Sequence, residues 1–227
     1  MSIKELQTGM FSLSAAGIDP GIPIARRPVS DLPAVGPEAA IEQAECLRSE
    51  LAGLLGPTKV RLSHNVARRC EAIAAQLPLD AASVARLTLA AHVHRAGELC
   101  LPASLTRKCF LDMSTRELAV YSQYPRFSTL FLTEGRPGNP FFDLMLSHRE
   151  YVLGAGFPLG KDARWAPLEA RVLCIATEYE ELMMHRGGTP EEEDTILRFM
   201  MSNLACRYQP ELVERLLATV ADDNGRH

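Results

Sequence analysis

Two histidines that are each followed by an arginine are the residues of this sequence best suited to chemistry. His94 precedes Arg95, and His148 precedes Arg149 and Glu150. Imidazoles and carboxylates together hold metal ions that acidify a water molecule and neutralise the phosphate that the water attacks. Arginine has only hydrogen-bond donors and keeps its charge, so it repels a divalent cation and attracts an anion. The two pairs are therefore compatible with a reduced metal site, an anion site or a network of ion pairs.

The first histidine falls on the apolar side of a predicted helix. Asp80 is a good N-cap for this helix. Leu87, Ala91 and His94 then follow at positions i, i+4 and i+7, which share one face of a helix. We therefore expect His94 to be buried, and a buried histidine on such a stripe is most often a hydrogen-bonded core residue.

Further helices are predicted in the second half of the sequence. Ser114 and Glu117 form a capping box, and Pro125 is expected to kink or stop the helix that follows the box. The best apolar stripe at helical spacing runs over 168–183, and Thr189 is the N-cap of another helix. The same half shows no alternation typical of a strand. The predicted fold class is therefore all-α.

The beginning of the sequence differs from the rest. Proline and glycine recur between Gly17 and Gly36, which argues against regular structure there. From Gly36 to Leu55 the residues are mostly Ala, Leu and Glu, and this composition predicts a first helix. We therefore expect two parts: an irregular N-terminal extension that includes this helix over 1–57, and a helical domain over 58–227.

Composition and charge exclude several classes of protein. Of the 227 residues, 47% are hydrophobic and 23% are charged, as in ordinary globular domains. A formal net charge of -4 provides no cationic field, so we expect no nucleic-acid polymer as a partner. No apolar run is long enough for a membrane span, and the first residues do not resemble a secretory signal peptide. The six cysteines include no Cys-x-x-Cys pair and are expected to be reduced in the cytoplasm.

The order and spacing of several blocks in the helical part resembles the HD-GYP family, a branch of the HD phosphohydrolases. Members of that family hydrolyse the bacterial messenger cyclic di-GMP at a site with two or three metal ions. The likeness covers roughly Val60 to Leu217 and implies an HD-domain-like helical bundle. The blocks that carry it are Leu89–Pro102, Tyr124-Pro125, His148-Arg149-Glu150, Gly154–Pro158, Pro167–Val172, Ala176–Leu182 and Tyr208–Val213.

Most of the metal ligands that the resemblance implies are replaced in this sequence. His94 and His148 remain of that ligand set. We therefore expect no cofactor; the alternative is iron, manganese or zinc bound by the two histidines and a carboxylate such as Glu150 or Glu180. The replaced positions are Thr58, Leu62, Arg95, Tyr124, Arg149 and Thr177.

Two uses of the arginines stay open. Arg95 and Arg149, together with His94 and His148, could bind an anion such as intact cyclic di-GMP, with guanidinium groups in place of metal cations. Alternatively, the arginines pair with nearby carboxylates, which turns the former metal site into a structural network of ion pairs. The candidate carboxylates are Glu98, Glu150, Glu178 and Glu180.

A loop supplies a further candidate site. Gly156, Phe157 and Pro158 keep the family's glycine and proline but replace its signature tyrosine by phenylalanine. We expect Gly156 to adopt a positive φ and Pro158 to help preserve the backbone shape of the loop. The resemblance implies that this loop contacts partner proteins such as GGDEF-type signalling domains.

Together these observations predict a cytoplasmic bacterial signalling protein that has lost hydrolysis and acts by binding. What it binds is either a partner protein or intact cyclic di-GMP. The alternative is an active cyclic di-GMP phosphodiesterase, or a related phosphohydrolase, with an atypical metal site. A third possibility is a helical scaffold without a small-molecule site, in which neighbouring carboxylates neutralise the arginines.

Overall fold

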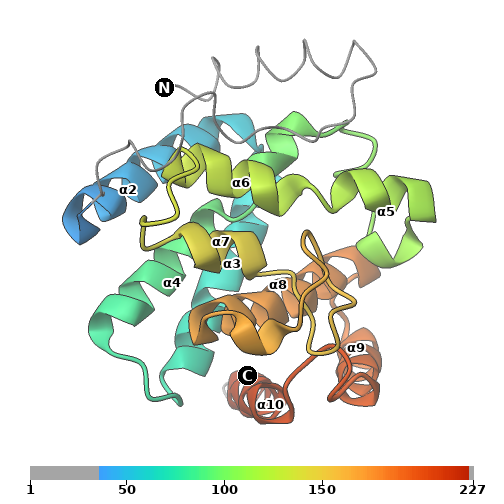
Figure 1. Cartoon of the computed structure of the whole chain (residues 1–227). Helices are drawn as coiled ribbons and strands as arrows, with labels where there is room; N and C mark the ends of the chain where they lie inside the picture. Colours follow the sequence, from blue (N-terminus) through green and yellow to red (C-terminus); the bar gives the residue numbers. More distant parts are fainter. Residues whose placement is uncertain (1–35, 225–227) are drawn as a thin grey trace.

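The computed structural model describes residues 36–224 as helices joined by loops (Figure 1). Residues 1–35 and 225–227 lie outside the described part, and with them the Pro/Gly-rich portion of the expected extension. The described part contains no strand, which confirms the all-α prediction, and none of its helices is long and apolar enough to cross a membrane. The α-helices are α2 (Pro37–Leu54), α3 (Pro57–Ala74), α4 (Ala81–Val93), α5 (Thr115–Tyr121), α6 (Tyr124–Thr133), α7 (Phe142–Ser147), α8 (Leu168–Arg186), α9 (Pro190–Ser202) and α10 (Pro210–Asn224). Short 3-10 helices are η2 (Ala96–Cys100), η3 (Phe110–Asp112) and η4 (Ala163–Trp165).

Local sequence signals set the helix ends where the sequence predicts them. The side chain of Asp80 accepts a hydrogen bond from a backbone N–H in the first turn of α4. Ser114 and Glu117 make both hydrogen bonds of a capping box at the start of α5. Pro125 lies in the first turn of α6, where its missing N–H costs nothing, so α5 ends before it instead of being kinked.

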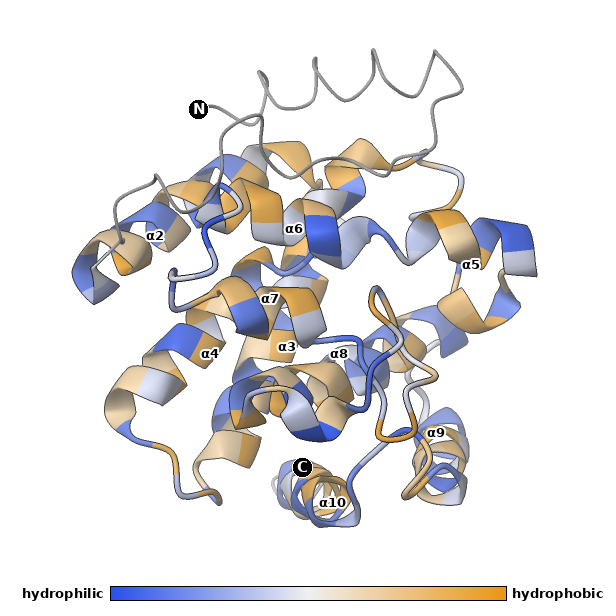
Figure 2. Ribbon diagram, in the orientation of Figure 1, coloured by the Kyte–Doolittle hydropathy of each residue, from blue (hydrophilic) through white to orange (hydrophobic). Residues whose placement is uncertain are grey.

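Helix α8 lies at the centre of the packing. It contacts α3, α4, α7, α9 and α10. Every residue from Val172 to Leu182 is buried, although Glu178, Glu180 and Glu181 are among them. Figure 2 shows this mixture, because hydrophilic and hydrophobic residues follow one another along α8. A helix that carries carboxylates into the interior has to pair them, and these pairs define the candidate site.

Helix α2 packs into the same core as the helices that follow it. It contacts α4 and α6 and buries one side. The division into an extension over 1–57 and a domain over 58–227 stays a prediction. The buried residues of α2 are Ala40, Ala44, Leu47 and Leu51.

Candidate functional site

His94 and His148 meet in the interior, where the centres of their rings lie 5.6 Å apart. His94 directly follows α4, and His148 directly follows α7. Nδ1 of His94 lies 2.7 Å from the carbonyl oxygen of Ala91, and Nδ1 of His148 lies 2.7 Å from that of Met145. A carbonyl oxygen only accepts, so each Nδ1 carries the proton and each Nε2 is an acceptor.

Hydroxyl groups face both Nε2 atoms. The hydroxyl oxygen of Tyr124 lies 3.1 Å from Nε2 of His148, and Oγ1 of Thr177 lies 3.5 Å from Nε2 of His94. Tyr124 and Thr177 are two of the positions where the family resemblance implies metal ligands. Burial lowers the pKa of His148 to about 3 and the pKa of His94 well below its ordinary value. Both imidazoles are therefore neutral and accept hydrogen bonds from hydroxyl groups.

The carboxylate of Glu181 joins the two arginines. It accepts a hydrogen bond from Nη1 of Arg149 at 2.9 Å and, on its other oxygen, one from Nη1 of Arg95. Arg95 also pairs with Glu98, and Nη2 of Arg149 lies 3.5 Å from Glu178. Burial alone would raise the pKa of Glu181, but Arg149 and Arg95 outweigh burial and lower it to about 2. With Arg95 3% and Arg149 0% exposed, both guanidinium groups are buried and neutralised.

Groups from α3 and α5 complete the network around Glu98. Nζ of Lys59 lies 2.8 Å from Oε2 of Glu98. The hydroxyl of Tyr121 is shared between Glu98 at 3.4 Å and Glu181 at 3.3 Å. Glu98, which is 2% exposed, is thereby paired with Lys59 and Arg95. Removing either cation would leave a buried carboxylate only partly compensated.

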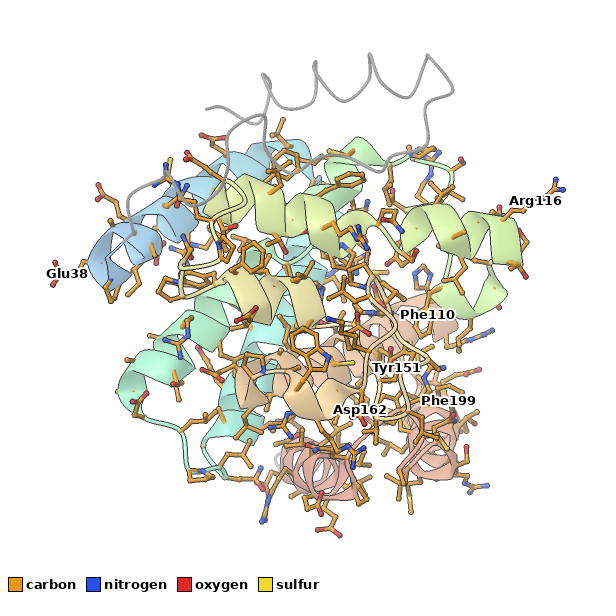
Figure 3. The ribbon with its side chains drawn as sticks, viewed as in Figure 1. Glu38, Phe110, Arg116, Tyr151, Asp162 and Phe199 are labelled. Atoms are coloured by element: carbon orange, nitrogen blue, oxygen red, sulfur yellow. The ribbon has the colours of Figure 1, made fainter. Side chains whose placement is uncertain are left out.

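Glu178 connects the arginine network to the turn between α9 and α10. Arg207, in this turn, lies 3.3 Å from Glu178, and the hydroxyls of Tyr151 and Tyr208 donate to the same carboxylate. The guanidinium carbon of Arg207 lies 4.3 Å from the ring centre of Tyr151 and 5.5 Å from that of Phe110, both labelled in Figure 3. These ring contacts hold the guanidinium group of Arg207 beside Glu178, while its side chain stays 18% exposed.

Two carboxylates that the sequence suggested as partners are engaged elsewhere. Glu150 accepts hydrogen bonds from two backbone N–H groups of the loop over 159–161, at 2.7 and 2.9 Å. Glu180 pairs with Arg69 at 3.0 Å. Neither side chain joins the two histidines, so the metal site suggested for them and these carboxylates is not assembled. The other two candidate carboxylates, Glu98 and Glu178, do contact the arginines.

Sequence reasoning missed Glu181, the residue with the most central position. A signal for it was present, because Thr177 and Glu181 are four residues apart on α8 and share one helix face. Thr177 stands at a position where the resemblance implies a metal ligand. A carboxylate one turn further along therefore faces the same place.

The donor set does not fit a centre with two bridging metal ions. Within residues 36–224, no group of three or more His, Cys, Asp or Glu side chains is placed to hold a metal ion. The two neutral histidines are surrounded by guanidinium and hydroxyl groups, and a guanidinium cannot act as a ligand. No metal-dependent step follows from this arrangement.

Glycine is required at position 156 because there is no room for a Cβ atom, and not because of its backbone conformation. The expectation of a positive φ at Gly156 is wrong, since the positive φ values in this loop occur at Gly154 and Gly160. A Cβ atom at position 156 would lie 2.3 Å from the carbonyl oxygen of Arg149. The loop therefore closes so tightly on the backbone after His148 that only glycine fits.

Phe157 points into the protein. It is 9% exposed, and its ring centre lies 6.2 Å from that of Tyr121 and 6.1 Å from that of Tyr124. The next residue, Pro158, is partly buried. The apolar side chain that this loop exposes is Leu153, at 70%. A protein that touches the loop would meet Leu153 and not the ring of Phe157.

These features coincide with a match to a known family. The chain matches the HD domain family over residues 41–212, which is most of its length, and it belongs to that family. With its motif order and its relatives taken together, it is an HD-GYP-like HD domain protein.

Two characterised relatives share part of this chain. It is 28% identical over 153 residues to the cyclic di-GMP phosphodiesterase response regulator RpfG of Xanthomonas campestris pv. campestris (strain 8004), covering 64% of this chain and 39% of that protein. It is 23% identical over 150 residues to a cyclic di-GMP phosphodiesterase of Thermotoga maritima, covering 64% and 40%. The chain thus spans about two fifths of the length of these relatives.

Solved structures share the fold. Bd1817, described as an HDG"Y"P protein from Bdellovibrio bacteriovorus, has a TM-score of 0.63 at 15% identity, covering 82% of this chain and 65% of that one. The HD domain of the L. monocytogenes phosphodiesterase PgpH has a TM-score of 0.50 at 16% identity, covering 82% and 97%. At these identities the likeness shows the HD-domain fold alone.

Proposed function

We propose that this protein is a cytoplasmic, non-catalytic signalling domain that acts by binding a partner protein. The carboxylate of Glu181, which bridges Arg95 and Arg149 beside the two histidines, carries the proposal. Hydroxyl groups engage the imidazole acceptors, and guanidinium groups engage the carboxylates. The side chains that would hold a metal ion, which in turn activates a water molecule, are thus already engaged in contacts within the protein.

The same contacts argue against the arginines as anion ligands. Arg95 and Arg149 are buried, and each already has two carboxylate partners. A phosphate group that entered would have to displace a carboxylate, and an uncompensated buried charge costs about 3–5 kcal/mol. Binding of intact cyclic di-GMP by these arginines is therefore the second hypothesis. The experiment below distinguishes it from the binding of a partner protein.

The loop after His148 supports the protein-binding role. It exposes Leu153 at 70%, and Trp165 of the following helix η4 is 41% exposed. The backbone N–H of Leu153 donates to the carbonyl oxygen of Cys206 at 3.0 Å, which fixes the loop against the turn between α9 and α10. Apolar and aromatic side chains on a fixed support are typical anchors of protein interfaces. A GGDEF-type signalling domain is the first partner to test, on the strength of the family resemblance.

The test combines binding and turnover of cyclic di-GMP. Labelled cyclic di-GMP is titrated onto the purified full chain with Mn²⁺ and, separately, after chelation, while the label is followed for linear product and the protein is assayed for iron, manganese and zinc. The Thermotoga maritima phosphodiesterase serves as the active control. We expect no product and no stoichiometric metal, because the groups a metal would need are already paired.

Two results would contradict the proposal. Linear product, or binding that requires metal, would establish the alternative, an active metal-dependent phosphodiesterase with an atypical site. Binding that survives chelation, yields no product and is lost in both Arg95→Ala and Arg149→Ala would instead establish a receptor for the intact messenger.

A further inference from the structure

A pocket of about 330 Å³ lies between the N-terminal half of α3 and the C-terminal end of α8. Helix α3 contributes Thr58, Arg61 and Asn65 to its lining, and α8 contributes Met183 and Met184. The two histidines and the two arginines of the buried network do not line it. The pocket is therefore distinct from the buried network, although Thr58 and Leu62, which line it, stand at positions where the family resemblance implies metal ligands.

The pocket is the open end of a seam that α10 covers elsewhere. Helix α10 packs on both α3 and α8. Arg69 of α3 pairs with Glu180 of α8 at 3.0 Å and reaches Thr219 and Asp223 of α10, each at 3.0 Å. Glu180 also lines the pocket, so the pocket begins where the contact with α10 ends. Where the seam between α3 and α8 is covered, the helix α10 fills it.

The wall formed by α3 is basic. In a chain with a formal net charge of -4, α3 carries four basic residues and one acidic residue. Lys59 and Arg69 are committed to ion pairs with buried carboxylates. Arg61 and Arg68 form no ion pair with any residue of the described part, and with Asn65 they follow one another at helical spacing on one face. Arg61 thus lines the pocket, and Arg68 lies two turns further along the same face of α3.

The wall formed by α8 combines two adaptable methionines with the carboxylate of Glu180, which is paired with Arg69. Met184 is 36% exposed, and Met183 packs against the core beside it. Unbranched methionine side chains change shape at low cost, and for that reason they are frequent at surfaces that accept apolar side chains of partner helices. Leu62 adds a buried apolar floor to the same pocket.

We propose that this pocket binds an amphipathic helix of a partner protein, with acidic residues flanking its apolar face. An apolar side chain of that helix enters between Leu62 and the two methionines, and acidic side chains pair with Arg61 and Arg68. Such a helix continues the seam that α10 occupies and complements the charge of α3. The inference rests on the proposed protein-binding function and deepens it by stating the chemistry and the seat of the partner.

The test uses designed peptides on the full chain. A fluorescein-labelled helical peptide of about 15 residues, with Leu on one face and Glu on both flanks, is titrated by fluorescence anisotropy. Matched peptides have the same composition in scrambled order, or Lys in place of Glu. We expect saturable binding of the Glu peptide alone, weakened at least about tenfold by Arg61→Glu and by Met184→Asp and weakened by added salt.

Arg116→Glu is the matched charge-reversal control. Arg116 is exposed on α5 and points away from the molecule (Figure 3), so its reversal should leave the affinity unchanged. Equal weakening by Arg61→Glu and Arg116→Glu, equal binding of the scrambled peptide, or no saturable binding up to about 1 mM peptide would overturn the proposal. Hydrolysis of cyclic di-GMP would overturn the proposed function without changing the peptide result, because Arg61 and Met184 lie outside the buried network.

Discussion

Glu181 shows how a single side chain can organise a buried site. Its two oxygens neutralise Arg95 and Arg149, and the hydroxyl of Tyr121 donates to one of these two oxygens. Two arginines in a protein interior would otherwise be uncompensated charges, which cost far more than a surface pair. The arginines are therefore tolerated because α8 supplies this carboxylate between them.

We predict that Glu181→Gln destabilises the protein by about 3–5 kcal/mol, because it leaves two buried arginines with one fewer carboxylate. Urea unfolding followed by circular dichroism measures the change. Glu42→Gln is the matched control, since Glu42 lies exposed on α2. Similar free energies of unfolding for both variants would show that Glu181 does not hold the arginines.

The helices of this protein were more predictable than the ion pairs between side chains of different elements. The apolar stripe of α8 and the caps at Asp80, Ser114 and Thr189 are local signals, and each lies where the sequence places it. The ion pair between Arg95 and Glu181 joins residues 86 positions apart. Local patterns contain no information on such a pair, so the sequence indicated charged partners for the arginines without identifying this one.

The loop at Gly156 illustrates a second limit of local reasoning. A glycine can be needed for a positive φ or for the absence of a Cβ atom, and the sequence does not distinguish the two. Here the carbonyl oxygen of Arg149 occupies the place of the Cβ atom. The family resemblance implied that this loop contacts partner proteins, and the structure turns the ring of Phe157 inward. The first outcome depends on how the loop folds back on residues 149–151, and the second on contacts with Tyr121 and Tyr124.

We predict that Gly156→Ala destabilises the protein by about 1–3 kcal/mol, because the added methyl group would overlap backbone atoms that cannot move independently. Gly53→Ala is the control. Gly53 lies inside α2 with open space around it, so alanine there should stabilise by about 0.5–1 kcal/mol. Thermal and urea unfolding of both variants measure the difference. A Gly156→Ala protein as stable as the wild type would show that the loop can shift freely.

The buried network connects elements that are far apart in the chain. It includes Lys59 from α3, Tyr121 from α5, Glu181 from α8 and Arg207 from the turn before α10. Charge burial on this scale makes the stability of the whole fold depend on protonation. The all-α class and the burial of His94 followed from the sequence, whereas this coupling appears only when the elements are assembled.

The neutral, buried histidines determine whether the stability of the fold rises or falls with pH. His148 has a pKa of about 3 in the folded protein, against about 6.5 in an unfolded chain, and burial also lowers the pKa of His94. Between these values the unfolded chain binds protons that the folded protein does not, so stability falls as the pH falls from about 6.5 toward 3. Each such histidine contributes a slope of about 1.4 kcal/mol per pH unit.

Urea unfolding at several pH values between about 7.5 and 5 measures this slope. His148→Gln should reduce it by the contribution of one proton, whatever the variant does to the stability itself, because glutamine does not titrate. A slope that is the same in His148→Gln and the wild type would contradict a neutral, buried His148. At lower pH, protonation of Glu181, whose pKa is about 2, removes stability in the same direction as the pH falls below about 4.5.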